Sequence, residues 1–446
     1  MTRDWGPMGP IRPMCPILRT ADSDSAPPKE TAMLHSSLSR RQLLRGGVAA
    51  ALFSVVPRNA LGGPGQKAPS DVITRGVIGT GGRGQAFLNG KVLAVCDVDK
   101  NHVAAAAKKI GTGCTPYADF RQLLEVQEID HICIATPPHW HALISIAAAQ
   151  AGKDVLCEKP MTKFIAEGQA VADAIRRHGR AFQIGTYGRF GMGKLRKLIE
   201  SGRLGKPLIV RAGRVQGYNW NIKWFTGLHV LPPQPVPPAL DYNLWLGPAP
   251  YKPYHPHRVH FMFRCYWDYD GGGLADQGQH HLDPIQYMLA KDDTGPCEVE
   301  AVAQQPAHPD ACGPWNKVII RYADDITIII EGGEWGPPPE EGKPFLEGPG
   351  GKVWRGGQCE PSGLMDGLDS LPDTKPLIGF DQAMRTRRPS GGSADSSHRA
   401  NTLFQLGNIA IRTGRTIRWD PVKQQCIGDE EANRLVNVPM RAPWHL

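Results

Sequence analysis

Between residues 72 and 190, short apolar runs alternate with stretches of helical periodicity. The runs that we predict as strands are Thr74–Ile78, Val92–Cys96, His131–Ala135, Asp154–Cys157 and Ala181–Ile184. The stretches that we predict as helices are Asn101–Ile110, Asp119–Leu124, Ala142–Ala151 and Glu167–His178. Strands that alternate with helices in this way indicate a doubly wound α/β domain, in which helices cover both faces of a parallel sheet.

The pattern changes after residue 190. A helix is predicted at Lys194–Ser201, and extended alternating runs follow at 207–216, 297–304 and 317–331. Alternation with a period of two is typical of an antiparallel sheet with one solvated face. We therefore predict a C-terminal α+β domain with an open, mostly antiparallel sheet and a late apolar helix at Asn401–Arg412.

These patterns divide the chain into three parts. Residues 1–70 show no domain pattern, residues 71–190 form the first predicted domain, and residues 191–446 form the second. A long irregular insertion, residues 218–270, interrupts the second domain, and loops of this length inside compact proteins are usually functional. Residues 332–376 are rich in glycine and proline and are predicted as a surface excursion.

Composition restricts the class of protein. A chain of 446 residues, 41% hydrophobic and 21% charged, is long enough and ordinary enough for a globular protein with two cores. The net charge is +8, and residues 1–62 contribute +4 of it, from eight basic and four acidic side chains. No basic run is interleaved with aromatic residues, so we predict no nucleic-acid partner. The ten cysteines lack metal-like spacing, and no disulfide framework is predicted.

A segment near the N-terminus, Ser39–Pro57, has the pattern of an export signal. Paired arginines precede an apolar stretch from Gly46 to Val56, and small residues follow it. The stretch is shorter than the roughly 18–20 residues that cross a bilayer, so no stable membrane span is predicted. The pattern predicts recognition by the twin-arginine export machinery and a periplasmic or extracellular location. A basic, mildly amphipathic terminal helix is the alternative.

The first predicted strand leads into a glycine-rich turn. Gly79, Gly81 and Gly84 have the G-x-G-x-x-G spacing, which allows a tight turn, close approach of a pyrophosphate, and close contact between helix and strand. A chain with 51 glycines can also produce this spacing by chance. Asp97 ends the second strand, where a carboxylate meets adenosine ribose hydroxyls. A dinucleotide site is predicted, with NAD favoured over NADP because the carboxylate repels a 2′-phosphate. Residues 85–90 leave room for a first crossover helix of only about two turns.

Two later strand ends carry groups suited to chemistry. The sequence ATPPHWH, residues 135–141, ends one strand, and CEKP, residues 157–160, ends the next. Both lie at the carboxyl edge of the predicted sheet, where open α/β sheets bind ligands. Lys159 at that edge can donate a charged hydrogen bond to a substrate hydroxyl, although a Glu-Lys-Pro sequence can also be a solvated turn.

A third sequence with chemical potential is GGGLADQGQHHLD, residues 271–283. If the chain is helical from Asp276, then Asp276, His280 and Asp283 share one face, and His281 is turned away by about 100°. A carboxylate beside a histidine orients the ring and raises its proton affinity, which a general base for an alcohol needs. A divalent metal site and a buried helix cap with a salt bridge are the other interpretations.

Six sequences in order resemble one family. VIGTGGRG, VCDVD, ATPPHWH, AGKDVLCEKPMT, WLGPAP and GGGLADQGQHHLD are similar to the Gfo/Idh/MocA oxidoreductases, specifically to their exported branch with a twin-arginine signal. The resemblance extends from about Val72 to the C-terminus. It implies an N-terminal Rossmann domain, a C-terminal domain that often mediates oligomers, and a dinucleotide held tightly between them. A homo-oligomer is therefore expected.

The resemblance also implies roles for individual residues. Lys159 would contact substrate and nicotinamide, His280 would be the acid/base, and Asp276 would be its neighbour. The implied coenzyme contacts are Gly79, Gly81, Gly82, Arg83, Gly84, Asp97, Thr136, Pro137, His141, Glu158 and Lys159. The candidate substrate contacts are Tyr187, Arg189, Trp267 and His281, and no metal ligands are assigned. A packing role for Tyr187 is the alternative, and this residue stands where relatives often carry glutamine.

We therefore predict an exported NAD-dependent oxidoreductase that acts on a sugar, polyol or glycoside. One alternative is a glycosidase that oxidises its substrate transiently, eliminates the substituent and reduces the product again. A second alternative is a non-catalytic sugar-binding protein that retains the fold. Aromatic residues of the insertion can stack on sugar rings, or can simply pack the loop or a subunit contact. They are Trp220, Trp224, Tyr254, His257, Tyr266 and Trp267.

Overall fold

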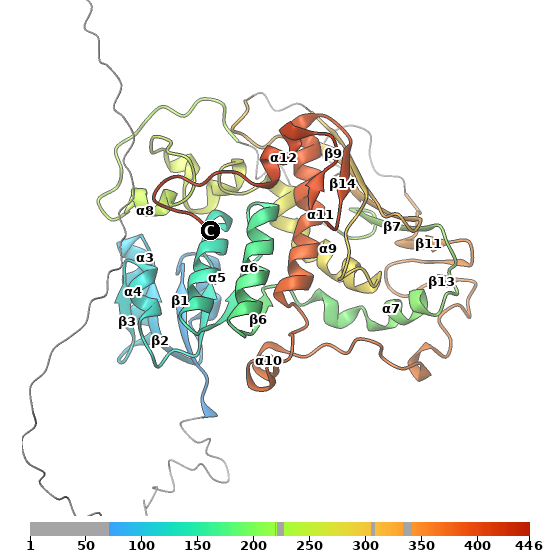
Figure 1. Ribbon diagram of the computed structural model, residues 1–446, viewed down its shortest axis with the longest axis horizontal. Helices are drawn as coiled ribbons and strands as arrows, with labels where there is room; N and C mark the ends of the chain where they lie inside the picture. The colour runs from blue at the N-terminus through green and yellow to red at the C-terminus, as the bar shows by residue number, and fades with distance from the viewer. Residues whose placement is uncertain (1–70, 219, 221–226, 305–307, 333–340) are drawn as a thin grey trace, which may run out of the picture.

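The computed structural model describes residues 71–218, 220, 227–304, 308–332 and 341–446 (Figure 1). The predicted export signal and Trp224 lie outside the described residues. Within the described part of the chain, no helix is both long and apolar enough to cross a membrane. The nine cysteines of this part are all free thiols.

A parallel sheet of six strands forms the N-terminal domain, in the order β3-β2-β1-β4-β5-β6. The strands are β1 (Thr74–Ile78), β2 (Lys91–Cys96), β3 (Thr115–Tyr117), β4 (His131–Ile134), β5 (Asp154–Cys157) and β6 (Phe182–Ile184). The five predicted strands are confirmed, with ends that agree to within one residue. Because the strand order reverses between β1 and β4, a crevice forms there at the carboxyl ends of the strands. The short β3 lacks a buried apolar face, which explains why the sequence did not predict it.

Helices cover both faces of this sheet (Figure 1). They are α3 (Lys100–Ile110), α4 (Phe120–Leu124), α5 (His141–Gln150) and α6 (Ile165–Arg177). The side chains of Asp99 and Asp119 cap α3 and α4 by accepting hydrogen bonds from backbone N–H groups two residues further on. Between β1 and β2 there is only η2 (Arg83–Phe87), a 3-10 helix of five residues, so the first crossover is as short as the sequence predicts.

A mixed sheet of nine strands forms the C-terminal domain, in the order β13-β12-β11-β7-β10-β9-β8-β14-β15. Among the described strands of this sheet, β10 and β7 form the one parallel pair and all other neighbours are antiparallel. The predicted open and mostly antiparallel sheet is confirmed. The central strands are β7 (Leu208–Gly213), β8 (Glu298–Ala303), β9 (Trp315–Arg321) and β10 (Ile326–Glu331), and β14 (Ile417–Asp420) and β15 (Gln425–Cys426) close one edge. The predicted extended run 317–331 is thus a hairpin that turns at Asp325, where φ is +60°.

The prediction of a surface excursion at residues 332–376 holds for most of the described side chains, which are exposed or partly exposed, but it missed strands that belong to the sheet. Three short strands, β11 (Leu346–Gly348), β12 (Gly351–Val353) and β13 (Cys359–Glu360), extend the sheet beyond β7. The side chains of Leu346 and Val353 are buried in the domain core. Glycine and proline dominate the composition here, so strands of two or three residues give no periodic signal.

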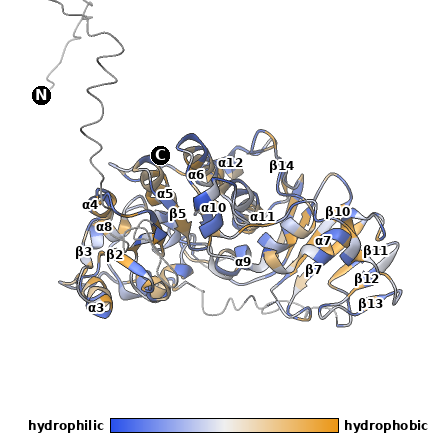
Figure 2. Ribbon diagram, turned by 90° about the horizontal axis from the view of Figure 1, so that it is seen from below, coloured by the Kyte–Doolittle hydropathy of each residue, from blue (hydrophilic) through white to orange (hydrophobic). Residues whose placement is uncertain are grey.

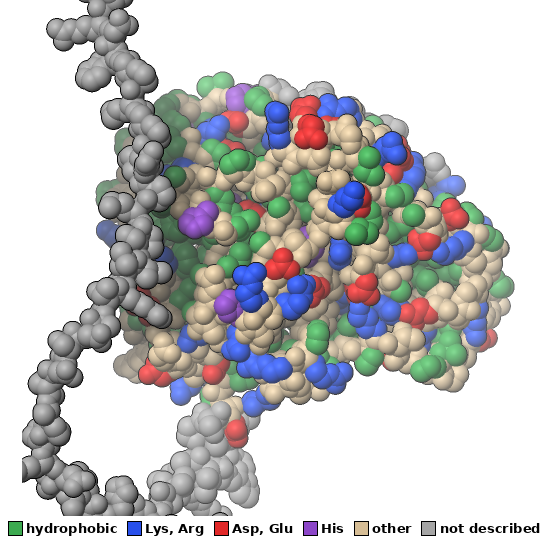
Figure 3. Space-filling model, viewed as in Figure 1, with side chains coloured by type: hydrophobic (Ala, Val, Ile, Leu, Met, Phe, Trp, Pro, Cys, Tyr) green, Lys and Arg blue, Asp and Glu red, His purple; other side chains and the backbone are tan. Residues whose placement is uncertain are grey.

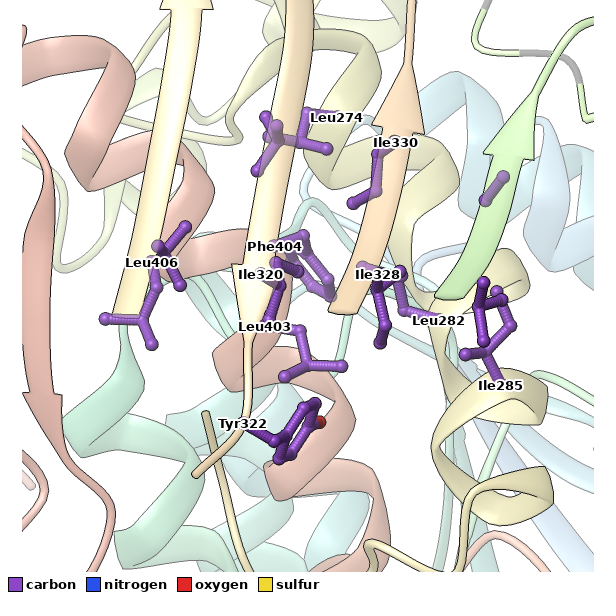
Figure 4. Packing of buried hydrophobic residues seen from close by; sticks show 14 of the residues in the cluster. Leu274, Leu282, Ile285, Ile320, Tyr322, Ile328, Ile330, Leu403, Phe404 and Leu406 are labelled. Atoms are coloured by element: carbon purple, nitrogen blue, oxygen red, sulfur yellow. The ribbon is translucent and has the colours of Figure 1, made fainter. Parts of the chain in front are cut away.

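Two long helices pack on one face of the nine-stranded sheet and form the core with it (Figure 4). They are α9 (Gly272–Met288) and α11 (Ala394–Thr413). Leu282 and Ile285 of α9 and Phe404 of α11 meet the isoleucines of β9 and β10. Helix α11 begins seven residues before its predicted start, because its first turns are polar in sequence yet buried. It also contacts α6 and thereby joins the two domains.

The insertion and the C-terminal tail return to the first domain. The insertion contains α8 (Tyr242–Leu246), η6 (Pro256–Arg258) and η7 (His260–Cys265), and a β-bridge between Asp99 and Leu240 attaches it beside β2. After α12 (Glu430–Val436), the tail places Trp444 edge-on against Trp140, with ring centroids 4.8 Å apart. The remaining helices are η3 (Pro138–Trp140), η4 (Gly188–Gly191), α7 (Gly193–Glu200), η8 (Leu368–Ser370) and α10 (Phe380–Thr386).

Side chains segregate as expected for a protein with two apolar cores. The strands and helix faces that meet inside each domain are hydrophobic (Figure 2). Charged side chains of both signs are spread over the face seen in Figure 3.

Candidate functional site

A cavity of about 610 Å³ lies where the carboxyl ends of the parallel strands meet the insertion. One wall comes from the first domain, through the glycine turn and the ends of β2, β4 and β5. The opposite wall comes from α8 and η7 of the insertion and from the start of α9. The predicted site residues that line it are Gly79, Gly81, Gly82, Arg83, Asp97, Thr136, Pro137, Glu158, Lys159, Asp276 and His280.

The glycine turn has the shape that a pyrophosphate requires. Gly79 has a left-handed backbone (φ +84°), and a Cβ there would lie 2.7 Å from the backbone of Thr136. A Cβ on Gly84 would lie 1.9 Å from the carbonyl oxygen of Gly79, so Gly84 gives the close helix–strand contact without itself lining the cavity. A Cβ on Gly82 would meet nothing within 4 Å. The first-turn N–H groups of η2, which no helix can satisfy internally, begin at this turn and suit an anion.

Asp97, which directly follows β2, lines the same cavity. Its carboxylate accepts hydrogen bonds from the N–H of Thr80 at 2.7 Å and from the N–H of Asp99 at 2.9 Å. Burial opposes ionisation of Asp97, but hydrogen bonding by His102 and by those N–H groups outweighs burial and lowers the pKa of the carboxyl. The ionised carboxylate can accept hydrogen bonds from ribose hydroxyls and repels a phosphate. The glycine turn and the carboxylate of Asp97 together fit a dinucleotide.

Two histidines that the sequence analysis did not select lie beside Asp97. His102 comes from α3 and His260 from η7, and their rings meet edge to face with centroids 5.0 Å apart. With Asp99 they form a group whose potential metal-ligand atoms lie within 4.8 Å of one another, where the sequence analysis assigned no metal ligands. The group joins residues about 160 positions apart through the insertion, so no local spacing reveals it. Because both histidines line the cavity, we treat the group as part of the same site.

Lys159 and Asp276 form an ion pair in the part of the cavity that also contains His280, which we call the chemical end. The ammonium nitrogen of Lys159 donates to the Asp276 carboxylate at 3.0 Å and to the Asp276 carbonyl oxygen at 2.6 Å. Burial raises the pKa of Asp276, but the positive charges of Lys159 and Arg264 outweigh burial and lower it overall. Lys159 follows β5, whereas Asp276 belongs to α9. The pair therefore joins the two domains within the site.

His280 lies one turn after Asp276 on α9 and lines the cavity. Burial, the positive charge of Lys159 and the neighbouring His281 lower its pKa to about 4, although Asp276 acts in the opposite direction. As expected, Asp276 acts to raise the proton affinity of His280, but burial outweighs this effect and the net pKa is lowered. His280 is neutral near pH 7 and can accept a proton.

An ion pair connects the glycine turn to the strand end that carries Lys159. The Arg83 guanidinium donates to Glu158 at 2.6 Å, and the carboxylate of Glu158 is buried while Arg83 is half-exposed. Thr136 and Pro137, which follow β4, complete this wall. The strands β1, β4 and β5 thus place the glycine turn, Thr136, Glu158 and Lys159 on one surface.

Two predicted contacts are buried away from the cavity. The Nδ1 atom of His141 lies 2.7 Å from the carbonyl oxygen of Pro160 and its Nε2 atom lies 2.8 Å from that of Thr136, and the neutral ring donates to one of the two. His141 therefore packs behind the loops that line the cavity. Arg189, predicted as a substrate contact, is buried between Asp283 and Asp292, at 2.8 Å from each. The sequence cannot show this pairing, because Asp292 lies beyond the end of α9. For Asp283, the buried salt-bridge interpretation is confirmed.

The remaining substrate candidates do not line the cavity. Trp267 is buried in the C-terminal core, where the Arg412 guanidinium carbon lies 5.3 Å from the centroid of its ring. His281 packs against the rings of Tyr218 and Trp220, at 4.8 Å from each. Tyr187 is 55% exposed at the surface. Trp220 and Trp267 are therefore buried packing residues and are not available to stack on a sugar ring.

Other aromatic and basic residues, which the sequence analysis did not assign, do line the cavity. Three of them, Phe261, Phe263 and Arg264, belong to the dense run HFMFRCYWDYD, residues 260–270, whose side-chain directions depend on η7. Arg264 is the most consequential, because its Nε donates to Asp276 at 2.7 Å. The others are Phe120, Trp140, Trp245, Phe261 and Phe263.

Family models match both domains. Residues 73–186 match the oxidoreductase family NAD-binding Rossmann fold, and residues 190–446 match the oxidoreductase family C-terminal alpha/beta domain, both of the Gfo/Idh/MocA group. The second match alone spans more than half of the chain. The chain therefore belongs to the Gfo/Idh/MocA oxidoreductase family.

Individual relatives are similar over part of the chain. An inositol 2-dehydrogenase of Salmonella paratyphi B is 34% identical over 123 residues, which is 27% of this chain and 37% of that protein. A levoglucosan dehydrogenase of Pseudarthrobacter phenanthrenivorans is 33% identical over 129 residues, which is 28% of this chain and 32% of that protein. The matched segments thus span well under half the length of these curated relatives.

A solved structure extends the likeness of fold to both domains. The WlbA dehydrogenase from Bordetella pertussis, in complex with NADH and UDP-GlcNAcA, is 17% identical with a TM-score of 0.51, over 78% of this chain and 99% of that chain.

Proposed function

We propose that this protein is an NAD-dependent oxidoreductase that acts on a hydroxyl group of a sugar, polyol or glycoside. The observation that carries the proposal is the shared cavity: the glycine turn and Asp97 line it together with the Lys159–Asp276 pair and a neutral His280. The names of the relatives, an inositol and a levoglucosan dehydrogenase, support this class of substrate.

The residues of the chain divide the work. Two N–H groups of the Lys159 ammonium bond to Asp276, which leaves the third free to donate to a substrate oxygen. His280, neutral above a pKa of about 4, accepts the proton of the substrate hydroxyl. The nicotinamide, when bound, supplies the chemistry of hydride acceptance and return. Phe261, Phe263 and Trp245 add apolar surface to the cavity wall beside these groups.

NAD is proposed in preference to NADP because Asp97 is ionised and faces the ribose end of the cavity.

We also propose export by the twin-arginine route, which the sequence of Ser39–Pro57 supports. A homo-oligomer is proposed as well. On the sheet strands packed by α9 and α11, the alternate side chains Ile209, Ile319 and Ile329 are only partly buried, which suits contact with a second copy.

The test of the catalytic assignment compares two adjacent histidines. His280→Ala should retain NADH, measured by coenzyme fluorescence, but should not reduce bound NAD with any sugar or polyol that wild type oxidises. His281→Ala is the matched control, because His281 packs against Tyr218 and Trp220 instead of lining the cavity. Full turnover in His280→Ala would refute the role of this residue.

Glycoside cleavage with a recycled coenzyme is the second candidate, and the insertion favours it. The insertion is fastened over the cavity by the Asp99–Leu240 bridge and by a hydrogen bond from Trp140 Nε1 to the Leu244 carbonyl at 3.1 Å. A coenzyme enclosed in this way exchanges slowly, which suits transient oxidation followed by elimination and reduction. Sugar release without net NADH supports this candidate, whereas stoichiometric oxidised product supports the dehydrogenase. If no carbohydrate reduces the bound coenzyme, the non-catalytic alternative holds.

A further inference from the structure

Arg264 reaches the chemical end of the cavity from the insertion. Its guanidinium carbon lies 4.8 Å from the ring centroid of Phe261 and 4.5 Å from that of Phe263. Its Nη1 also donates to the Phe261 carbonyl oxygen at 3.1 Å. The side chain is 20% exposed. Cation–π contacts and a backbone hydrogen bond therefore fix the direction of the guanidinium.

The guanidinium is directed at the carboxylate that holds Lys159. Arg264 Nε donates to Oδ1 of Asp276 at 2.7 Å, and Lys159 Nζ donates to the same oxygen at 3.0 Å. The second oxygen of Asp276 accepts from the side chain of Gln277 at 3.0 Å. One buried carboxylate is thus shared by two cations, which leaves the Lys159 ammonium only partly neutralised and oriented by a fixed acceptor.

Other charged or titratable groups face Asp276 from the elements around it. Lys159 follows β5, Arg264 belongs to η7, His280 is one turn further along α9, and Asp270 precedes that helix. Burial and the charge of Asp276 raise the pKa of Asp270 to about 7. Burial also favours protonation of Asp276 itself, and Lys159 and Arg264 are the two cations that oppose it. Removal of either cation should therefore return a proton to Asp276 at a higher pH.

We infer that Arg264 is a positioning residue of the catalytic centre, which keeps Asp276 ionised and fixed so that Lys159 points its free N–H at the substrate. The inference rests on the proposed function of Lys159. It makes the insertion a structural part of the catalytic site, because a single turn, η7, supplies both Arg264 and the cavity-lining His260.

The test uses the full chain with bound NAD and the variants Arg264→Gln and Arg264→Lys. Arg258→Gln is the matched control, because Arg258 lies in the same insertion, is 9% exposed, and stacks on Tyr266 at 5.0 Å without touching Asp276. The acid limb of kcat/KM should move to higher pH by about 1 to 3 pH units in Arg264→Gln, and less in Arg264→Lys, whose cation is retained. The limb of Arg258→Gln should coincide with that of wild type.

A second readout does not depend on turnover. In protein labelled with ¹³C at aspartate carboxyl carbons, the resonance that Asp276→Asn lacks reports the titration of Asp276. Its midpoint should rise in Arg264→Gln and stay unchanged in Arg258→Gln. An unchanged midpoint would overturn the inference, as would an acid limb identical to that of wild type. If the midpoint rises but no carbohydrate is turned over by wild type, the position of Arg264 is upheld and the proposed function fails.

Discussion

Replacement of Gly84 by alanine tests the closest contact in the glycine turn. The new Cβ would lie 1.9 Å from the carbonyl oxygen of Gly79, whereas ordinary van der Waals contacts of a Cβ are 3.4–4 Å, so the turn must open by more than an ångström. Overpacking of this kind costs about 1–3 kcal/mol. With a shift of about 2–4 °C per kcal/mol for domains of 150–250 residues, we expect a melting temperature lower by about 2–12 °C. NADH affinity should fall as well, because the opened turn no longer follows the pyrophosphate.

Gly82→Ala is the matched variant, since a Cβ at this position meets nothing within 4 Å and lies on the cavity wall. Its melting temperature should equal that of wild type, while NADH binding weakens because the methyl group occupies space meant for the coenzyme. Differential scanning fluorimetry and NADH fluorescence titration measure the two effects. The account of the turn fails if Gly84→Ala has wild-type stability and affinity, or if Gly82→Ala unfolds as easily as Gly84→Ala.

Three further predictions concern other parts of the molecule. Arg189→Met leaves the buried Asp283 without its cation and Asp292 with Lys375 alone, and it should lower the free energy of unfolding by about 3–5 kcal/mol. Arg176→Met, which breaks two exposed pairs, should change it by less than about 1 kcal/mol in denaturant titrations. Asp97→Asn removes the negative charge at the ribose end and should raise the NADP-to-NAD affinity ratio about tenfold or more, an effect absent if Asp97 does not face the ribose. Thermal stability should fall as pH drops from about 6.5 to 4, because burial lowers the pKa of several histidines to about 4 and the unfolded chain then binds more protons. A flat stability profile over this range would contradict that burial. These histidines are His131, His139, His141 and His398.

The elements that carry long apolar patterns were predictable from the sequence. The strands β4 and β5 are continuous buried runs, and β1 and β2 are buried over most of their length. The glycines at the first and last positions of the G-x-G-x-x-G spacing lie where a Cβ would clash with backbone. The small strands β11 to β13 were not predictable, since two or three residues among glycines and prolines show no period. Local periodicity therefore defines the scaffold of the first domain well and the edge of the second sheet poorly.

The site residues that follow a strand end or share a helix face were predictable from the sequence. Lys159 and Glu158 follow from the end of β5, and Asp276 and His280 from the periodicity of α9. Arg264 and His260 were missed because an irregular insertion has no periodicity from which to infer side-chain directions. Arg189 was misassigned for a related reason, since its partner Asp292 is over a hundred positions away in sequence.

The central claim is that a carbohydrate hydroxyl and a coenzyme meet in the cavity beside Lys159 and His280. The most direct measurement loads the protein with NAD, adds polyols and glycosides deuterated at the carbons that bear hydroxyl groups, and determines the mass of the recovered coenzyme. We predict that at least one substrate transfers deuterium to the coenzyme in wild type and in His281→Ala, and that none does so in His280→Ala. A coenzyme that binds but never acquires deuterium from any of these substrates would contradict the claim.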